Sequence, residues 1–410
     1  MNLEKRLKNY ANLIVKSGCV IDEGSELFIN APVSCVDFTR MVVKAAYEQG
    51  AKAVYVTYRD DVCGRMSYDY SPMECFENFP EWSALRNNSV ARKGASTLTI
   101  LSDDPNIMKG VDTKKLMART IAAHKACKEF YDALDFGKCA WCIVGAASPV
   151  WAKTVFPSLD EDSAMEALWD AILSSARITE DDNAVETWKE HQSSFDERKK
   201  WMNEQNFVKL HYKASNGTDF KVGLMKKGRW EGGGQKRVDG THFFPNIPTE
   251  EIYTSPNRTS AEGIVYSSLP LIHNGSPVKD FWLRFKEGKV VDFDARVGRD
   301  VLKSIIKTDE GSARLGECAL IPFNSPIQNL RVLFYETLYD ENASCHLALG
   351  KGFPDCFEGG FDMTSEELLE SGLNNSATHV DFMIGTKDLN ITGISDSGKK
   401  IPIFINGNWA

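Results

Sequence analysis

The chain has 410 residues, of which 42% are hydrophobic and 26% charged, and its net charge is −9. This composition is typical of a globular protein, and the length favours two or more domains over a single core. The negative charge argues against a general nucleic-acid binder. No apolar run reaches the about 18 residues that a membrane span requires.

The N-terminal residues 2–16 have the periodicity of an amphipathic helix and lack the apolar stretch of a secretory signal peptide. The ten cysteines follow no spaced framework, so we expect reduced thiols in a cytoplasmic protein. Cys139 and Cys142 have CxxC spacing, but they fall inside a strand pattern instead of opening a helix. That context favours buried core thiols over a redox pair.

The first half of the chain alternates between strand and helix patterns. Strands are expected at residues 26–32, 53–58, 96–102 and 140–146, and helices at residues 2–16, 36–50 and 113–134. Strands separated by helices of this length predict a parallel sheet with helices on both faces. The first half is therefore predicted to be an α/β domain.

Residues 160–205 are expected to be helical, and the polar segment from Trp188 to Asn206 predicts an exposed connecting helix. We place the domain boundary in this segment, with an N-terminal α/β domain at residues 1–190 and a C-terminal domain at residues 191–410.

The second half has the pattern of short strands. Asn216-Gly217 is a hairpin turn signal between two alternating segments. Strands are expected at residues 207–214, 219–224, 280–285, 289–293 and 401–405. The C-terminal domain is therefore predicted to be mostly antiparallel β, with a few helices.

Five potential metal ligands lie in about the last 160 residues: Glu251, Glu317, His346, His379 and Asp381. Carboxylates combined with imidazoles suit zinc, cobalt or manganese, and two such ions close together can activate a water molecule. In His379-Val-Asp381 the two polar residues would share one face of a strand, so both could reach one metal. A structural ion pair explains this motif equally well.

Two further carboxylates precede His346 in the sequence. Asp340 or Asn342 could cap a helix that then holds His346. This explanation accounts for Asp340, but it does not account for Glu341 lying so close to a histidine.

Glu250 and Glu251 are neighbours in a segment that we expect to be extended. Adjacent strand residues face opposite sides, so only one of the two should enter the site. His242 lies near this segment and could line the site without binding metal. The sequence contains no Walker A motif, no dinucleotide fingerprint and no His-Glu-x-x-His motif.

Five segments taken in order resemble the thermophilic aminopeptidase family, which includes the aminopeptidase T, aminopeptidase S and PepS type enzymes. The segments are Gly228-Arg-Trp-Glu-Gly-Gly-Gly, Asp239-Gly-Thr-His-Phe-Phe-Pro-Asn-Ile-Pro-Thr-Glu-Glu-Ile, Leu315-Gly-Glu-Cys-Ala-Leu, Phe334-Tyr-Glu-Thr-Leu-Tyr-Asp-Glu-Asn-Ala-Ser-Cys-His-Leu-Ala and Thr378-His-Val-Asp-Phe-Met-Ile-Gly-Thr. The resemblance extends over essentially the whole second half of the chain, and the first half is compatible with it but carries no comparable signature.

The resemblance implies a cytoplasmic, homodimeric exopeptidase that removes N-terminal residues from peptides. From the net charge and the lack of a long apolar run we expect neither nucleic-acid nor membrane partners. It implies two divalent ions, which could be zinc, cobalt, manganese or magnesium. The family's metal ligands fall on the five residues already selected, with Glu341 as a further ligand.

The expected reaction uses a water activated between two ions about 3.5–4 Å apart. We expect Glu317 to be the carboxylate that bridges the ions. A spare carboxylate, which could be Glu250, Glu251 or Glu341, would carry the proton to the leaving amine.

One position departs from the family pattern. The family has a catalytic tyrosine seven residues after the ligand histidine, and this chain has Phe353 there. Tyr339, Tyr335 or another donor could substitute for the missing hydroxyl. An alternative is a catalytically weak family member that binds peptides or metal. A nucleotide-binding oxidoreductase is disfavoured because the glycine fingerprint is missing.

Overall fold

The computed structural model describes residues 2–410, and the chain divides into two compact units. The first unit consists of Met1–Ser193, Gly233–Thr249 and Val332–Tyr335, and the second of Ser194–Gly232, Glu250–Arg331 and Glu336–Ala410. No helix within residues 2–410 is long and apolar enough to cross a membrane.

The first unit is built on a five-stranded sheet with the order β10-β4-β3-β1-β2, in which all neighbouring strands are parallel. The strands are β1 (Glu26–Pro32), β2 (Ala53–Arg59), β3 (Ser96–Leu101), β4 (Trp141–Gly145) and β10 (Asn246–Ile247). A separate two-residue pair joins β8 (Gln235–Lys236) to β9 (His242–Phe243). The predicted parallel sheet is confirmed, and β10 extends it.

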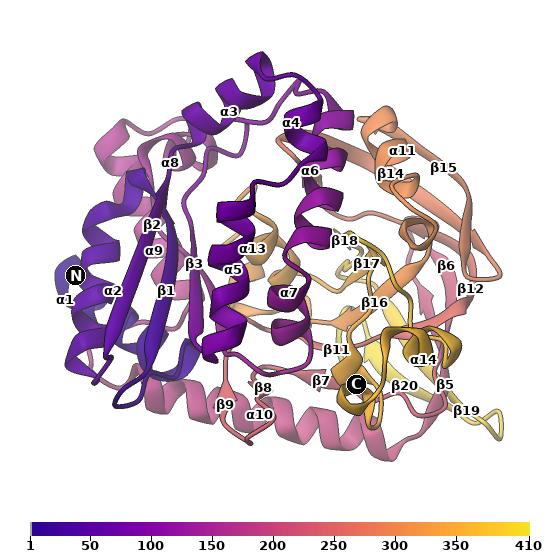
Figure 1. Ribbon diagram of the computed structural model, residues 1–410. Coiled ribbons are helices and arrows are strands. Elements are labelled where there is room, and N and C mark those ends of the chain that lie inside the picture. The colour runs from indigo at the N-terminus through magenta and orange to yellow at the C-terminus, as the bar shows by residue number, and fades with distance from the viewer. Residues whose placement is uncertain (1) are drawn as a thin grey trace. The chain divides into compact units, whose positions relative to one another are not determined.

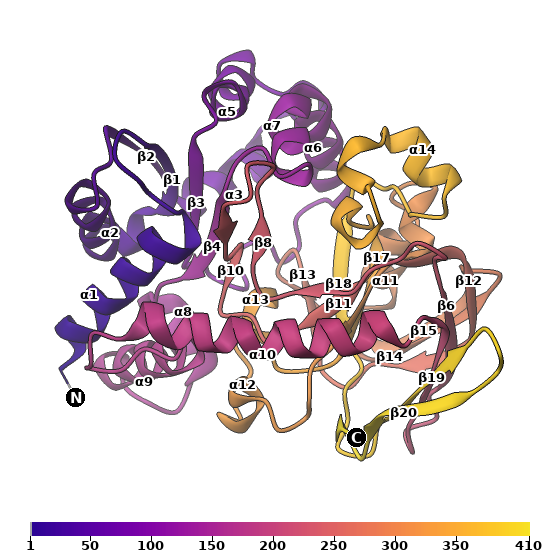
Figure 2. The same ribbon diagram turned by 90° about the horizontal axis from the view of Figure 1, so that it is seen from below.

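Helices lie on both sides of this sheet, with α2 and α5 drawn on opposite sides of β1 and β3 (Figures 1 and 2). The helices of this part of the chain are α1 (Leu3–Leu13), α2 (Val36–Glu48), α3 (Asp61–Tyr70), α4 (Glu74–Glu77), α5 (Glu81–Lys93), α6 (Thr113–Ala126), α7 (Lys128–Asp135), α8 (Pro149–Val155) and α9 (Glu161–Ser175). Tyr10, Phe38 and Trp169 pack their rings together and join α1, α2 and α9. These long crossovers are the connections that parallel strands require.

The single helix predicted at residues 113–134 is wrong, because α6 ends at Ala126 and α7 begins at Lys128. The side chain of Asn88 donates a hydrogen bond to the Ala126 carbonyl (3.0 Å) and accepts one from the Phe130 N–H (3.2 Å). This side chain satisfies backbone groups that a continuous helix would pair internally.

Helix α10 (Ala184–Glu204) contradicts the prediction of an exposed connecting helix. Trp188, Phe195 and Met202 are all buried. They recur every seven residues, so they form one narrow apolar stripe along this helix. Trp188 also donates from Nε1 to the Ala176 carbonyl (2.8 Å).

The second unit contains two antiparallel sheets. The larger has nine strands in the order β13-β14-β12-β6-β5-β19-β20-β21, with β15 paired to β14, and the smaller has the order β18-β17-β16-β11-β7. The strands of the larger sheet are β5 (Phe207–Lys213), β6 (Asp219–Leu224), β12 (Pro256–Tyr266), β13 (Leu271–His273), β14 (Ser276–Lys286), β15 (Lys289–Val297), β19 (Asn390–Ser395), β20 (Lys400–Ile405) and β21 (Asn408–Trp409). The predicted antiparallel β character of the second half is confirmed.

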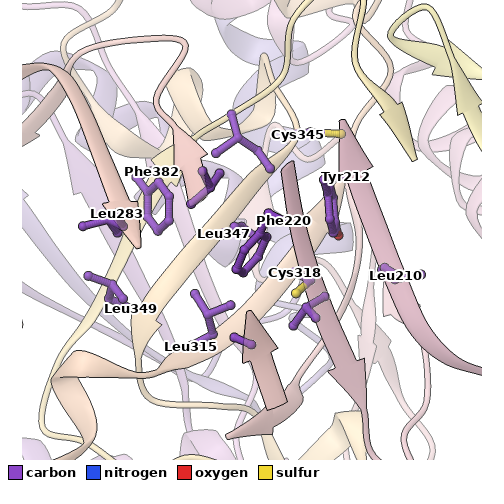
Figure 3. Packing of buried hydrophobic residues seen from close by; sticks show 14 of the residues in the cluster. Leu210, Tyr212, Phe220, Leu283, Leu315, Cys318, Cys345, Leu347, Leu349 and Phe382 are labelled. Atoms are coloured by element: carbon purple, nitrogen blue, oxygen red, sulfur yellow. The ribbon is translucent and has the colours of Figure 1, made fainter. Parts of the chain in front are cut away.

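The smaller sheet consists of β7 (Glu231–Gly232), β11 (Ile252–Thr254), β16 (Leu315–Leu320), β17 (His346–Gly350) and β18 (His379–Met383). Four helices complete the second unit: α11 (Arg299–Ile306), α12 (Pro326–Asn329), α13 (Thr337–Asn342) and α14 (Ser365–Glu370). A shared hydrophobic core joins the two sheets. Figure 3 shows Phe220 and Leu283 of the larger sheet packed with Leu347 and Phe382 of the smaller one.

Candidate metal centre

The smaller sheet has two chemically different faces, and strand alternation separates them. One face carries the apolar residues of the shared core: Leu315, Cys318, Leu320, Leu347, Leu349, Val380 and Phe382. The pairing register places the remaining positions on the other face, where Ala319 lies opposite His346 and Ala348 lies opposite both Glu317 and Asp381. The polar face therefore collects imidazoles and carboxylates from β16, β17 and β18.

A β-bulge in β16 turns Glu317 toward this face. Leu315 pairs with Leu349 while Glu317 pairs with Ala348, so β16 has one residue more than β17 at this step. In a regular strand Leu315 and Glu317 would share a face, whereas here Leu315 lies in the apolar core. Bulges of this kind redirect side chains at functional sites.

His346 is buried at the start of β17 and lies among three carboxylates. Its Nε2 is 3.1 Å from Glu251 Oε2, 4.0 Å from Glu317 Oε1 and 3.9 Å from Asp381 Oδ1. Glu251 directly precedes β11, so β11, β16, β17 and β18 all contribute or position a group here.

His379 is the first residue of β18, and it belongs to a second group of three potential metal ligands. Its Nε2 is 3.0 Å from Glu317 Oε2 and 3.1 Å from Asp381 Oδ1. The ligand atoms of Glu251, Glu317 and His346 all lie within 4.8 Å of one another, and so do those of Glu317, His379 and Asp381. The five predicted ligands are thus brought together, and Glu317 belongs to both groups.

Both imidazoles have their Nδ1 atoms turned toward backbone carbonyls. His346 Nδ1 lies 3.1 Å from the carbonyl oxygens of Glu341 and Ser344, and His379 Nδ1 lies 2.7 Å from that of Lys351. A carbonyl oxygen can only accept, so each Nδ1 carries a hydrogen and donates it. In the neutral imidazole, Nε2 then presents a lone pair to the carboxylates.

Glu341 lies at the same site, from the last turn of α13. It shares a side-chain hydrogen bond with Asp381. Burial, followed by the charge of Asp381, raises the pKa of Glu341 well above its usual value. The expectation that His346 lies on the helix capped by Asp340 or Asn342 is wrong, because the cap is Glu336 and the helix ends before His346.

The charges of this cluster shift several protonation equilibria. Burial, with help from the charge of Glu251, raises the pKa of Glu317 to about 7. Burial alone would lower the pKa values of His346 and His379, but the neighbouring carboxylates reverse this effect and raise both well above the usual value. The pKa of Asp381 is lowered, because the charges of His379 and His346 outweigh its burial.

The donor set fits a divalent cation. Two imidazole nitrogens and several carboxylates are the ligands that zinc, cobalt and manganese accept. Glu251 Oε2 is buried, and when His346 is neutral this oxygen faces the lone pair of Nε2 at 3.1 Å instead of a hydrogen-bond donor. Buried carboxylates facing imidazole lone pairs repel one another unless positive charge lies between them. A bound cation would supply that charge, and protons on the imidazoles supply it otherwise.

Glu250, predicted as a catalytic carboxylate, is not part of either ligand group. Its N–H donates to Asn342 Oδ1 (2.8 Å). Burial lowers the pKa of Arg198, and the negative charge of Glu250 opposes that shift. The carboxylate of Glu250 therefore stabilises the charged form of the Arg198 guanidinium. This arrangement is consistent with the expectation that only one of the adjacent glutamates enters the site.

The two aromatic residues predicted near the reaction occupy different places. Phe353 lies beside the metal-ligand group, with its ring centroid 4.8 Å from that of His379 and 5.8 Å from that of Tyr253. The Tyr253 hydroxyl donates to Asp355 Oδ2 (2.9 Å). Tyr339 is fully buried on α13, two residues before Glu341.

Lys351 is a site residue that sequence reasoning missed. Its contribution is a backbone carbonyl, which no side-chain pattern can reveal. Gly316 gave a weak signal, since a glycine within a strand pattern often marks a bulge or a close approach of two backbone segments. A Cβ at Gly316 would lie 2.1 Å from the Lys351 carbonyl oxygen.

A sheet that presents two imidazoles and several carboxylates on one face has the donor set of a metal-dependent enzyme. The profile of the thermophilic metalloprotease family, M29, matches residues 3–409. The chain is 43% identical to "Aminopeptidase AmpS" of Bacillus subtilis (strain 168), over 100% of this chain and 99% of that protein. It is 40% identical to "Aminopeptidase 2" of Geobacillus stearothermophilus, over 99% of this chain and 98% of that protein.

A solved structure agrees with these sequence relatives. The wild-type AmpT of Thermus thermophilus matches with a TM-score of 0.90 and 34% identity, over 99% of each chain. The chain belongs to the M29 family of thermophilic metalloproteases. It is a metallo-exopeptidase, a hydrolase with a divalent metal cofactor, and the family resemblance found in the sequence is confirmed.

Proposed function

We propose that this enzyme removes N-terminal amino acids from peptides with two divalent ions held by the members of the two ligand groups, Glu251, Glu317, His346, His379 and Asp381. Glu341, which the family resemblance added to this set, lies beside them through its hydrogen bond to Asp381. The observation that carries the two-ion proposal is the position of Glu317. Its Oε1 faces His346 and its Oε2 faces His379, and it belongs to both ligand groups. A carboxylate that offers one oxygen to each group is suited to bridging.

The bound ions would polarise the scissile carbonyl and lower the pKa of a water molecule, which is the general chemistry of two-metal hydrolases. The protein's own contribution is to hold the ligands in place. Backbone carbonyls orient both imidazoles, and the bulge at Gly316 aims Glu317. Because Glu251, Glu317, His346 and Asp381 are buried, interactions between the bound ions and a substrate would act in a medium less polar than water.

We assign the proton transfer to Glu341. The burial of its carboxyl and its hydrogen bond to Asp381 support this role, because they favour a form that carries a proton. A general acid with a raised pKa can deliver a proton to the leaving amine and take it up again afterwards. Glu250 is a less suitable carrier, since its charge acts on Arg198.

The direct test is peptide hydrolysis by metal-stripped and reconstituted protein. Removal of metal with a chelator should abolish the release of N-terminal residues from a panel of aminoacyl chromogenic amides. Added cobalt, zinc or manganese should restore it, and titration should reach a plateau at two ions per chain. Full activity without metal would contradict the proposal, and a plateau at one ion would contradict the bridging role of Glu317.

The homodimer and the cytoplasmic location expected from the family resemblance remain predictions. A dimer would have twice the chain mass of 45.8 kDa.

A further inference from the structure

His379 can orient Nε2 toward the carboxylates only if an acceptor holds its Nδ1. That acceptor is the carbonyl of Lys351, 2.7 Å away. Lys351 lies just beyond the end of β17 and belongs to neither a helix nor a strand. The position of its carbonyl must therefore be fixed by contacts other than the sheet ladder.

Asn374 holds the residues on both sides of Lys351. Its Nδ2 donates to the carbonyl of Gly350 (2.5 Å), and its own backbone carbonyl accepts from the N–H of Gly352 (2.9 Å). The second hydrogen of Nδ2 goes to the carbonyl of Gly311 (2.9 Å). Asn374 is only 1% exposed, so water cannot replace these bonds.

Two other contacts fix the remaining freedom of Lys351. Its N–H donates to the carbonyl of Thr378 (2.8 Å), which directly precedes His379. Gly316 allows β16 to approach the Lys351 carbonyl so closely that a side chain there would overlap it. The peptide before Lys351 and the peptide after it are both held, so the carbonyl points in one direction.

We propose that Asn374 is a positioning residue of the metal centre. It fixes the position of the segment Gly350–Gly352. The Lys351 carbonyl in this segment sets the orientation of the His379 ring and determines that Nδ1 is the nitrogen that carries the hydrogen. This inference deepens the proposed function and rests on it where it concerns metal affinity. The loss of a residue that orients a metal ligand through hydrogen bonds typically weakens metal affinity by about 10–100-fold.

The experiment compares Asn374→Ala with Asn375→Ala, a neighbouring asparagine whose side chain is exposed. Asn329→Ala, which removes an exposed asparagine side chain at the end of α12, is a second control. Asn374→Ser, which retains one donor, is a milder variant in case the alanine variant fails to fold. Circular dichroism and thermal unfolding establish that each variant is folded.

The first readout is the Nδ1–H proton signal of His379 in metal-free protein, observed by NMR with labelled histidine and assigned with His379→Gln. This hydrogen is present whether the imidazole is neutral or charged, so the readout needs neither metal nor activity. We expect the signal to shift or disappear in both Asn374 variants and to persist in both controls. An unchanged signal in a folded Asn374 variant would overturn the inference.

The second readout is calorimetric titration with manganese or cobalt ions. We expect Asn374→Ala to weaken binding about 10–100-fold, while the controls stay within about twofold of the wild type. Equal affinity in Asn374→Ala and wild type would also overturn the inference. If the wild type binds no divalent ion, the proposed function fails, and the histidine signal still decides the role of Asn374.

Discussion

Glu317 differs from every other carboxylate of the site in the position of its two oxygens, because each faces a different imidazole. We expect Glu317→Gln to lose metal as well as rate, since a neutral amide cannot bridge two cations. Glu250→Gln should retain normal metal content, because Glu250 belongs to neither ligand group. Metal analysis of both purified variants checks the prediction, and similar mild losses in both would contradict the bridging role.

Phe353 places an apolar ring against His379, at the position where the family resemblance led us to expect a tyrosine. We expect Phe353→Tyr to raise kcat and to leave KM nearly unchanged, because a new donor would bond mainly to the developing oxyanion. A well-placed donor contributes roughly 10²–10³-fold in rate.

The companion variant Tyr339→Phe tests whether another hydroxyl has taken over. Tyr339 is fully buried and lies on the same short helix as Glu341. A large loss of kcat in Tyr339→Phe would assign the donor to Tyr339. Steady-state kinetics that are unchanged in both variants would exclude a hydroxyl donor at either position.

The side chains of the site could be predicted from the sequence, but the atoms that orient them could not. His379 and Asp381 were recognisable because residues two apart in a strand share a face. Glu341 was recognisable from its closeness to His346 in the sequence. The carbonyl of Lys351 and the amide of Asn374 act through folding contacts between distant segments, and every residue type has a backbone carbonyl. Their roles become visible only when the folded structure shows which distant segments lie in contact.

At the scale of elements, Asn342 joins helix α13 to the segment that carries Glu251. It is fully buried, donates to the Leu338 carbonyl (2.9 Å) and accepts from the Glu250 N–H (2.8 Å). We expect Asn342→Ala to lower the free energy of unfolding by about 1–3 kcal/mol, because it leaves a buried N–H without its partner. Denaturant unfolding measures this change. Asn329→Ala, at an exposed position at the end of α12, should change stability by less than about 0.5 kcal/mol.

Elements with a clear period were predicted well, and elements without one were missed. β1, β3 and β5 alternate or run apolar over six or seven residues, so their patterns are readable. The two-residue strands β7 and β10 are too short to show any period. Helix α3 contains no buried residue, so it lacks an apolar face that the sequence could reveal. The stripe of α10 was overlooked because its apolar residues recur only every seven positions.

The stability of the folded chain should depend on both bound metal and pH. In metal-free protein the pKa of Glu317 is about 7 against a usual 4.5, and the pKa values of His346 and His379 lie well above 6.5. Groups with a raised pKa bind more protons when folded, so they lose their stabilising contribution as pH rises. For Glu317 this loss falls between pH 4.5 and about 7, and for the imidazoles above pH 6.5. The pKa of Asp381 is lowered from 3.8, so its stabilising contribution is lost when the pH falls below 3.8 and does not change above it.

Divalent ions reverse this dependence, because they bind ionised carboxylates and neutral imidazoles and displace the protons. We therefore expect the difference in Tm between metal-saturated and chelator-treated protein to grow from pH 5 to pH 8. At a free-metal concentration of 100 times Kd, binding stabilises the fold by about 2.7 kcal/mol. Titratable groups outside the site affect both samples equally, so they cancel in this difference. Thermal scans with and without manganese or cobalt check the expectation, with Glu317→Gln as the control whose difference should be smaller. A Tm difference that stays constant across this pH range would show that protons and metal do not compete at the cluster of His346 and His379.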